Sequence, residues 1–161
     1  MLITTCVLFS CSSPLNEKKE GDKKTDPLFA LLSPEQTNIH FSNTLEENLN
    51  LNVLMYEYLY NGGGVAAGDV NNDGLQDIYF TGNMVSNKLY LNKGKMEFED
   101  ITTASGTSGD GRWSRGVAVV DINNDGKMDM YVCATAKYDP LERKNILYVN
   151  QGVDKNNIPV F

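Results

Sequence analysis

The sequence predicts an all-β fold made of about two four-stranded blades of a β-propeller. The first observation is an internal repeat: residues 64–80 align with residues 116–132, and ten of the seventeen aligned positions are identical. The second is that each copy holds short apolar runs separated by turns rich in Gly and Asn. Four short strands in a unit of about 50 residues are typical of a propeller blade. The segment 44–60 has only partial helical spacing, so we expect an irregular loop there.

Four segments of the first copy predict its strands in chain order. Residues 65–67 are small and apolar, which is typical of a strand that is buried on both faces. Residues 78–80 and 89–91 combine aromatic and aliphatic side chains, and residues 98–101 alternate like a half-exposed strand. We place this first blade unit at residues 61–106.

The second copy repeats the pattern but stops before its last strand. Apolar runs at residues 117–120, 130–132 and 147–149 predict three strands, and we place the unit at residues 113–161. Propellers close with roughly four to eight blades. We therefore expect the chain to be an N-terminal fragment of a longer protein. The alternative is that the two sheets pack in another way.

The N-terminus resembles the signal of bacterial lipoproteins, in which the peptide is cut before a cysteine that then carries lipid. An apolar run ends at Cys11, so we predict a signal peptide at residues 1–10 and acylation of Cys11. A polar, charged stretch follows, and we interpret residues 11–34 as a disordered tether to the repeat region at residues 35–161. The alternative is a frayed hydrophobic N-terminus or a miscalled start codon, followed by a plain disordered stretch.

The cysteines and the charge narrow the class of protein. Cleavage before Cys11 would leave Cys133 without a disulfide partner, and we expect Cys133 to be a small buried residue. The net charge of −7 argues against nucleic-acid binding, which requires a basic face, and is compatible with cations. No stretch approaches the roughly 20 apolar residues of a membrane-spanning helix.

The stretch DVNNDGLQD, residues 69–77, places oxygen-bearing side chains two residues apart. Such a ladder can surround one hard cation, and an all-oxygen set favours Ca²⁺ over Zn²⁺ and over Mg²⁺, which keeps more water. Gly74 permits the sharp turn because glycine adopts a positive φ at little cost. The predicted ligands of a first structural Ca²⁺ are Asp69, Asn71, Asp73, the backbone carbonyl of Leu75, and Asp77.

The stretch DINNDGKMD, residues 121–129, repeats this ladder with Gly126 at the turn. Three carboxylates in so short a loop would repel one another without a cation. The predicted ligands of a second structural Ca²⁺ are Asp121, Asn123, Asp125, the backbone carbonyl of Lys127, and Asp129.

Two other interpretations of the ladders were considered. An EF-hand needs Glu at position 12, where this sequence has Phe80 and Val132, and the flanking segments are predicted strands. An ordinary hairpin turn needs no metal and explains Asp73 and Gly74 alone. It does not explain why the other oxygen-bearing residues recur at matched places, so we predict a calcium loop within a β-hairpin.

Single residues outside the ladders favour packing over chemistry. His40 is the only histidine and has no visible nucleophile partner, so we predict no catalytic residue. Residues 38–42 are expected to form an edge strand. Trp113 could stack on a sugar, but we expect it to pack between blades.

Taken together, GDVNNDGLQDIYFTGN, NKLYLNKG and FEDIT resemble the FG-GAP/VCBS repeats of integrin-type β-propellers, closest to cartilage-acidic-protein-like bacterial exported lipoproteins. The second copy, WSRGVAVVDINNDGKMDMYV, fits the same pattern. The resemblance implies an integrin-like, seven-bladed propeller with calcium loops on its hairpins. In bacterial members it implies export, often with a lipid anchor.

Two functional hypotheses follow from this sequence. The first is a calcium-binding propeller segment of an exported protein, anchored by lipid at the outer membrane and facing the periplasm or the cell surface. Its role would be binding or adhesion, with a protein or carbohydrate ligand and with no enzyme activity. The alternative is a scaffold within an exported enzyme that cleaves polysaccharides or phosphoesters and whose catalytic part lies outside this chain.

Overall fold

The structure, a computed structural model, describes residues 27–136 and 139–161. Every helix and strand below belongs to the unit Leu32–Phe161. The predicted signal peptide and Cys11 lie outside the described residues, as does most of the predicted tether. Within the described part, no helix has the length and apolar character needed to cross a membrane.

The first repeat unit folds as one antiparallel four-stranded sheet. Its strands follow the chain in the order β1 (Val65–Gly68), β2 (Asp77–Phe80), β3 (Lys88–Asn92) and β4 (Phe98–Asp100). All four coincide with the apolar runs that predicted them. A sheet in which each strand pairs with the next has only short connections, as expected of a blade.

The second repeat unit forms a three-stranded antiparallel sheet. It contains β5 (Trp113–Val120), β6 (Asp129–Thr135) and β7 (Ile146–Tyr148), with a short 3-10 helix η1 (Leu141–Arg143) before β7. After β7 the chain forms a small turn closed by one bridge between Val153 and Pro159. The protein is therefore mostly β, and its two sheets are consistent with propeller blades.

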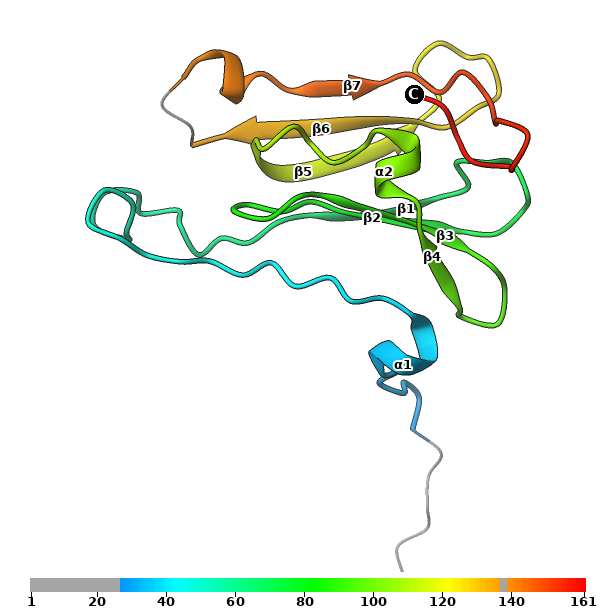
Figure 1. The fold of residues 1–161 in the computed structure, drawn as a ribbon, viewed down its shortest axis with the longest axis horizontal. Coiled ribbons are helices and arrows are strands. Elements are labelled where there is room, and N and C mark those ends of the chain that lie inside the picture. The colour runs from blue at the N-terminus through cyan, green and yellow to red at the C-terminus, as the bar shows by residue number, and fades with distance from the viewer. Residues whose placement is uncertain (1–26, 137–138) are drawn as a thin grey trace, which may run out of the picture. The chain divides into compact units, whose positions relative to one another are not determined.

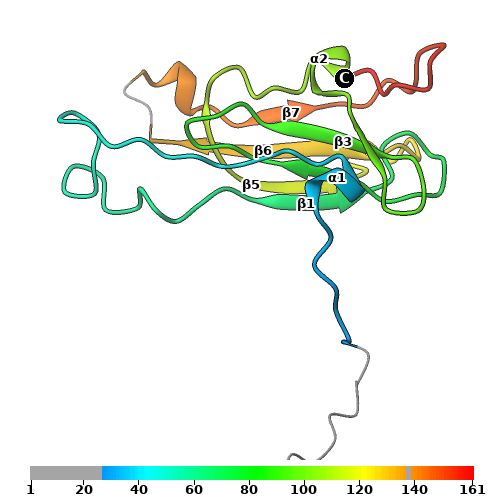
Figure 2. The ribbon, with the colours of Figure 1, turned by 60° about the horizontal axis from the view of Figure 1, so that its bottom comes forward.

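The two sheets pack face to face as separate layers (Figure 1), and the hydrophobic core lies between them. A Cβ at Gly68 of β1 would clash with Val119 of β5, so the small residue permits this close approach. The first sheet and the turn after β1 contribute Val70, Tyr79, Leu89 and Leu91, and the second contributes Met130, Val132 and Tyr148. Helix α2 (Thr102–Ser105) lies beside the C-terminal segment in both views (Figures 1 and 2).

The segment before β1 contains one short helix, α1 (Pro34–Thr37), and otherwise irregular structure, as expected for residues 44–60. The prediction of an edge strand at residues 38–42 is wrong, because this segment pairs with no strand. It contacts the first sheet mainly through side chains: Phe41 stacks on Phe80, with ring centroids 5.0 Å apart.

Two burial predictions are also wrong. Val65 of β1 is 61% exposed, although its strand was expected to be buried on both faces. Cys133 of β6 is exposed, although it was expected to be buried. Both residues lie on sheet faces directed away from the core, because only one face of each sheet packs against the other sheet.

Candidate metal centre

Residues 69–76 join β1 to β2 in a tight turn that is held by the Asp69 carboxylate. Asp69 Oδ1 accepts a hydrogen bond from the Asp73 backbone N–H at 3.0 Å, and Oδ2 accepts one from Gly74 at 2.8 Å. Asn72 and Gly74 adopt φ values of 59° and 86°. Asn and Gly tolerate this left-handed region best, so the local sequence determines the shape of the turn.

Two more polar side chains of this turn, those of Asn71 and Asp73, fold back onto it. Asn71 Nδ2 donates to Asp73 Oδ2 at 2.8 Å, and Asp73 Oδ1 accepts from the Leu75 N–H at 2.9 Å. Short side chains that bond to nearby backbone groups are characteristic of such turns. A carboxylate has about four acceptor sites, so these oxygens retain lone pairs that could bind a cation.

Asp77 differs from the rest of the ladder because it is buried, at 1% exposed. Its Oδ2 accepts from the Val70 N–H and its Oδ1 from the Asn92 N–H, both at 2.9 Å. The pKa of Asp77 is raised to about 6, chiefly by burial and less by the nearby charges of Asp73 and Asp69, while the two hydrogen bonds partly offset this rise. A cation close to Asp77 would favour its charged form.

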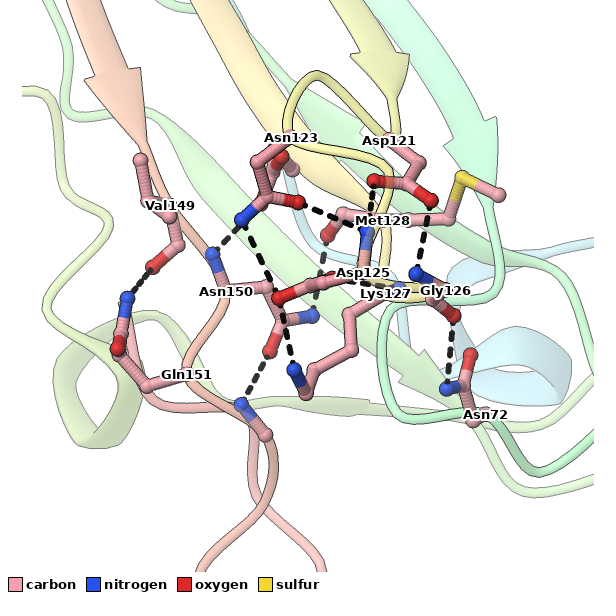
Figure 3. A network of polar contacts seen from close by, with 12 residues as sticks. Asn72, Asp121, Asn123, Asp125, Gly126, Lys127, Met128, Val149, Asn150 and Gln151 are labelled. Carbon is pink, nitrogen blue, oxygen red and sulfur yellow. Dashed lines mark hydrogen bonds and ion pairs between the residues drawn. The ribbon is translucent and has the colours of Figure 1, made fainter.

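The second loop, residues 121–128 between β5 and β6, repeats the geometry of the first (Figure 3). Asp121 accepts from the backbone N–H groups of Asp125 at 3.0 Å and Gly126 at 2.8 Å. Asp129 is fully buried and accepts from the Ile122 N–H at 3.0 Å and the Asn150 N–H at 2.8 Å. The repeat in sequence is therefore a repeat in hydrogen bonding.

The loops differ at position 7. Lys127 Nζ lies 2.8 Å from Asp125 Oδ2, and hydrogen bonds from the Lys127 side chain and backbone lower the pKa of Asp125. The matching residue of the first loop, Leu75, carries no charge. The second loop thus has an ammonium group at the carboxylate that was predicted to bind the ion.

The chemistry of both donor sets fits a hard cation, because carboxylate, amide and peptide oxygens are the ligands of Ca²⁺. The structure brings the predicted ligands of each ladder into one turn, and it keeps the two ladders as separate loops. Across residues 27–136 and 139–161, no three His, Cys, Asp or Glu side chains form a group that could hold a metal ion. Each site would therefore also need the amide and backbone oxygens that the sequence predicts.

The two loops lie at the same end of the two sheets (Figures 1 and 2) and touch each other. Asn72 Nδ2 of the first loop donates to the Gly126 carbonyl of the second at 3.2 Å. A pocket of about 180 Å³ opens between them. Its lining residues are Val70, Asn71, Asn72, Lys127, Asn150, Gly152 and Val153.

Asn150 joins this region and was not predicted as a site residue. It is 1% exposed, and its Nδ2 donates to the Val70 carbonyl at 2.7 Å and to the Met128 carbonyl at 3.0 Å. Its repeat counterpart Asn92 also binds a position-9 carboxylate through its backbone N–H. The alignment of these two asparagines after the third strand of each unit was the available sequence signal.

Trp113 is buried, as a packing residue should be, but the ring that it meets belongs to the segment before β1 and not to the other sheet. It is 2% exposed and meets the Tyr56 ring edge-on, with centroids 5.9 Å apart. Arg115 Nη2 donates to the Tyr56 hydroxyl at 2.8 Å and to the Tyr58 carbonyl at 2.6 Å. These contacts attach the segment before β1 to the second sheet.

The segment that carries both loops matches a known family of repeats. Residues 69–132 match the family described as FG-GAP-like repeat. The chain is also similar to cartilage acidic protein 1 of Xenopus tropicalis, at 39% identity over 72 residues, and to that of Homo sapiens, at 35% over 72 residues. Each match covers 44% of this chain and 11% of the relative, so the chain corresponds to a small part of these proteins.

Proposed function

We propose that this chain, an FG-GAP-like repeat segment over residues 69–132, is a calcium-binding part of a β-propeller in an exported, lipid-anchored protein. Its role would be binding or adhesion toward a protein or carbohydrate, and it would have no catalytic site of its own. The repeat match and the two antiparallel sheets support the propeller segment. The calcium, the anchor and the binding role are proposals.

The observation that carries the calcium proposal is the identical arrangement of acceptors in the two loops. In each loop the first Asp accepts from the backbone N–H groups of positions 5 and 6, and the last Asp is buried at the end of the following turn. A bare hairpin turn needs only its Asn-Asp-Gly centre. Clustered carboxylates repel one another, so their recurrence at matched places favours a cation.

Within this proposal, the residues of each ladder have two different roles: some bind the ion, and one orients the loop. The first two Asp residues, the Asn and the peptide oxygen of each ladder would bind the ion, which supplies positive charge that offsets the carboxylates. The buried Asp77 and Asp129 orient the loop through the backbone N–H groups that they accept from. The proposed role is structural, since each loop connects the first two strands of its sheet.

Calcium binding is tested by thermal unfolding in Ca²⁺ and in EGTA. A ligand that binds only the folded state stabilises it by about 2.7 kcal/mol at a hundredfold excess over Kd. The melting temperature should rise with Ca²⁺, and Asp73→Ala combined with Asp125→Ala should abolish the increase. Glu99→Gln, which changes a carboxylate outside both ladders, should keep it. Identical melting curves in Ca²⁺ and EGTA would refute the proposal.

The anchor is tested separately, because Cys11 lies outside the described residues. Labelled palmitate should enter the full chain expressed in a bacterium that processes lipoproteins. Cys11→Ser should lose the label, and Cys6→Ser should keep it. Equal labelling of Cys11→Ser and the unaltered chain would exclude lipid attachment at this cysteine.

A further inference from the structure

We propose that the two loops bind Ca²⁺ as a coupled pair, so that an ion in one loop tightens the binding of an ion in the other. This inference rests on the proposed function and deepens it. It is carried by two routes of hydrogen bonds that join the loops directly. One route crosses between the exposed turns, and the other joins the two buried position-9 carboxylates.

The exposed route connects the turn of the first loop to that of the second. Asn72 donates from its side chain to the Gly126 carbonyl at 3.2 Å, and the Gly126 N–H donates to Asp121 Oδ2 at 2.8 Å (Figure 3). Both peptide groups of Gly126 are thereby fixed, one by each loop. Ordering of the first loop therefore restricts the backbone that carries the ligands of the second.

The buried route links Asp77 to Asp129 through two residues. Asp77 Oδ2 accepts from the Val70 N–H at 2.9 Å, and the Val70 carbonyl accepts from Asn150 Nδ2 at 2.7 Å. The Asn150 N–H then donates to Asp129 Oδ1 at 2.8 Å. All four residues are at most 3% exposed, so water does not compete with these bonds.

The coupling arises because each loop restricts the conformations of the other. A loop that is already fixed by its partner loses less conformational entropy when it binds an ion, so the second ion binds more tightly. Repulsion between two ions opposes the effect, and water between the exposed turns screens it.

The repeat itself supplies matched controls. Asn124 of the second loop has the same φ of 59° as Asn72, yet its side chain makes no hydrogen bond within the described residues. Asn92 of the first sheet occupies the position of the first unit that Asn150 occupies in the second. Its side chain donates only within its own unit, to the Gln76 carbonyl at 3.0 Å. Asn124 is therefore the control for Asn72, and Asn92 is the control for Asn150. Each control residue occupies the matching position but makes no side-chain hydrogen bond to the described part of the other unit.

Calorimetric titration of the chain with Ca²⁺ tests the coupling. After statistical correction, the second ion should bind about five- to tenfold more tightly than the first, at the lower end of measured couplings. Asn72→Gly keeps the favoured backbone conformation and should lower this ratio, because it removes one of the two routes. Asn150→Ala should do the same, while Asn124→Gly and Asn92→Ala should retain the ratio of the unaltered chain.

The outcomes separate the two proposals. Uptake of two ions with a ratio near one in the unaltered chain would overturn the coupling and leave calcium binding intact. Retention of the ratio in Asn72→Gly together with Asn150→Ala would also overturn it. Absence of any binding heat, with unchanged melting, would refute calcium binding and the coupling together. Circular dichroism in EGTA checks folding, and if Asn150→Ala is unfolded, Asn72→Gly decides the question.

Discussion

Asp77 and Asp129 show how one residue type can have two roles in the same ladder. The sequence predicts them as ligands equivalent to the other Asp residues. The structure buries both and directs two backbone N–H groups to each of them. These carboxylates therefore stabilise the fold with or without an ion, while Asp69 and Asp73, which are less buried, stabilise mainly the turn.

This difference predicts unequal costs of substitution in EGTA. Asp77→Ala leaves the N–H groups of Val70 and Asn92 without partners, and each buried unpaired group costs about 1–3 kcal/mol. We expect a loss of about 2–5 kcal/mol in the free energy of unfolding, measured with urea. Asp73→Ala, at an exposed position, should cost under about 1 kcal/mol. Equal losses would show that the two roles are not separate.

Position 7 of the ladders predicts a difference in affinity between the loops. The Lys127 ammonium lies on Asp125, and an exposed pair of this kind is worth up to about 1 kcal/mol. Lys127→Leu should therefore strengthen Ca²⁺ binding to the second loop by about two- to fivefold. Leu75→Lys should weaken binding to the first loop by a similar factor. Calorimetry that finds both constants unchanged would contradict this assignment.

At the scale of elements, the strands were predictable and their surroundings were not. Short apolar runs and the repeat located β1 to β7 to within a few residues. Burial of Val65 and Cys133 was predicted wrongly because an apolar strand does not indicate which of its faces another sheet will cover. The contacts of Asn72 and Asn150 between loops depend on how two units pack, which a single unit's sequence does not encode.

The Asp100 carboxylate, which accepts hydrogen bonds from Thr102 at the start of helix α2, predicts a pH effect. Burial tends to raise the pKa of Asp100, but hydrogen bonds from Lys88 and Thr102 outweigh it, so its pKa lies below the usual range. A lowered carboxyl pKa contributes stability above the pKa of the unfolded chain, and this is lost as pH falls through the folded value.

Asp100→Asn should therefore cost under about 1 kcal/mol at pH 7, because the Lys88 pair is partly exposed and screened. The difference from the unaltered chain should vanish in acid, below the lowered pKa of Asp100. Urea unfolding of both proteins, from pH 7 into acid, measures this difference in the free energy of unfolding. Glu99→Gln, on the same strand, removes a carboxylate that contacts neither Lys88 nor Thr102 and serves as the control variant. A difference that persists undiminished in strong acid would show that the charge of Asp100 is not its cause.

At the scale of the whole molecule, the two sheets pack by unlike faces. Tyr79 of the first sheet faces the second sheet and is 1% exposed, whereas its repeat counterpart Tyr131 is 38% exposed. The same holds for Leu89, at 1%, and its counterpart Leu147, at 45%. The face that makes the interface on one unit is thus repeated, uncovered, on the other. Such head-to-tail packing can continue with further units.

This uncovered face predicts that the isolated chain self-associates. Exposed apolar patches favour association, and Tyr131, Cys133 and Leu147 lie on one face of the second sheet. Sedimentation velocity, in reductant to exclude a Cys133 disulfide, should show oligomers that grow with concentration. Tyr131→Lys with Leu147→Lys should shift the chain to monomer without lowering its melting temperature, since neither side chain is in the core.

The matched control uses apolar side chains that are equally exposed elsewhere. Leu49 and Leu54, each 93% exposed, lie in the loop before β1 and away from this face. Leu49→Lys with Leu54→Lys adds the same charge and should leave the association unchanged. A monomer at every concentration, or an equal effect of both pairs, would mean that the repeated face does not direct assembly. An effect confined to the Tyr131 and Leu147 pair would identify the surface on which a further repeat unit packs.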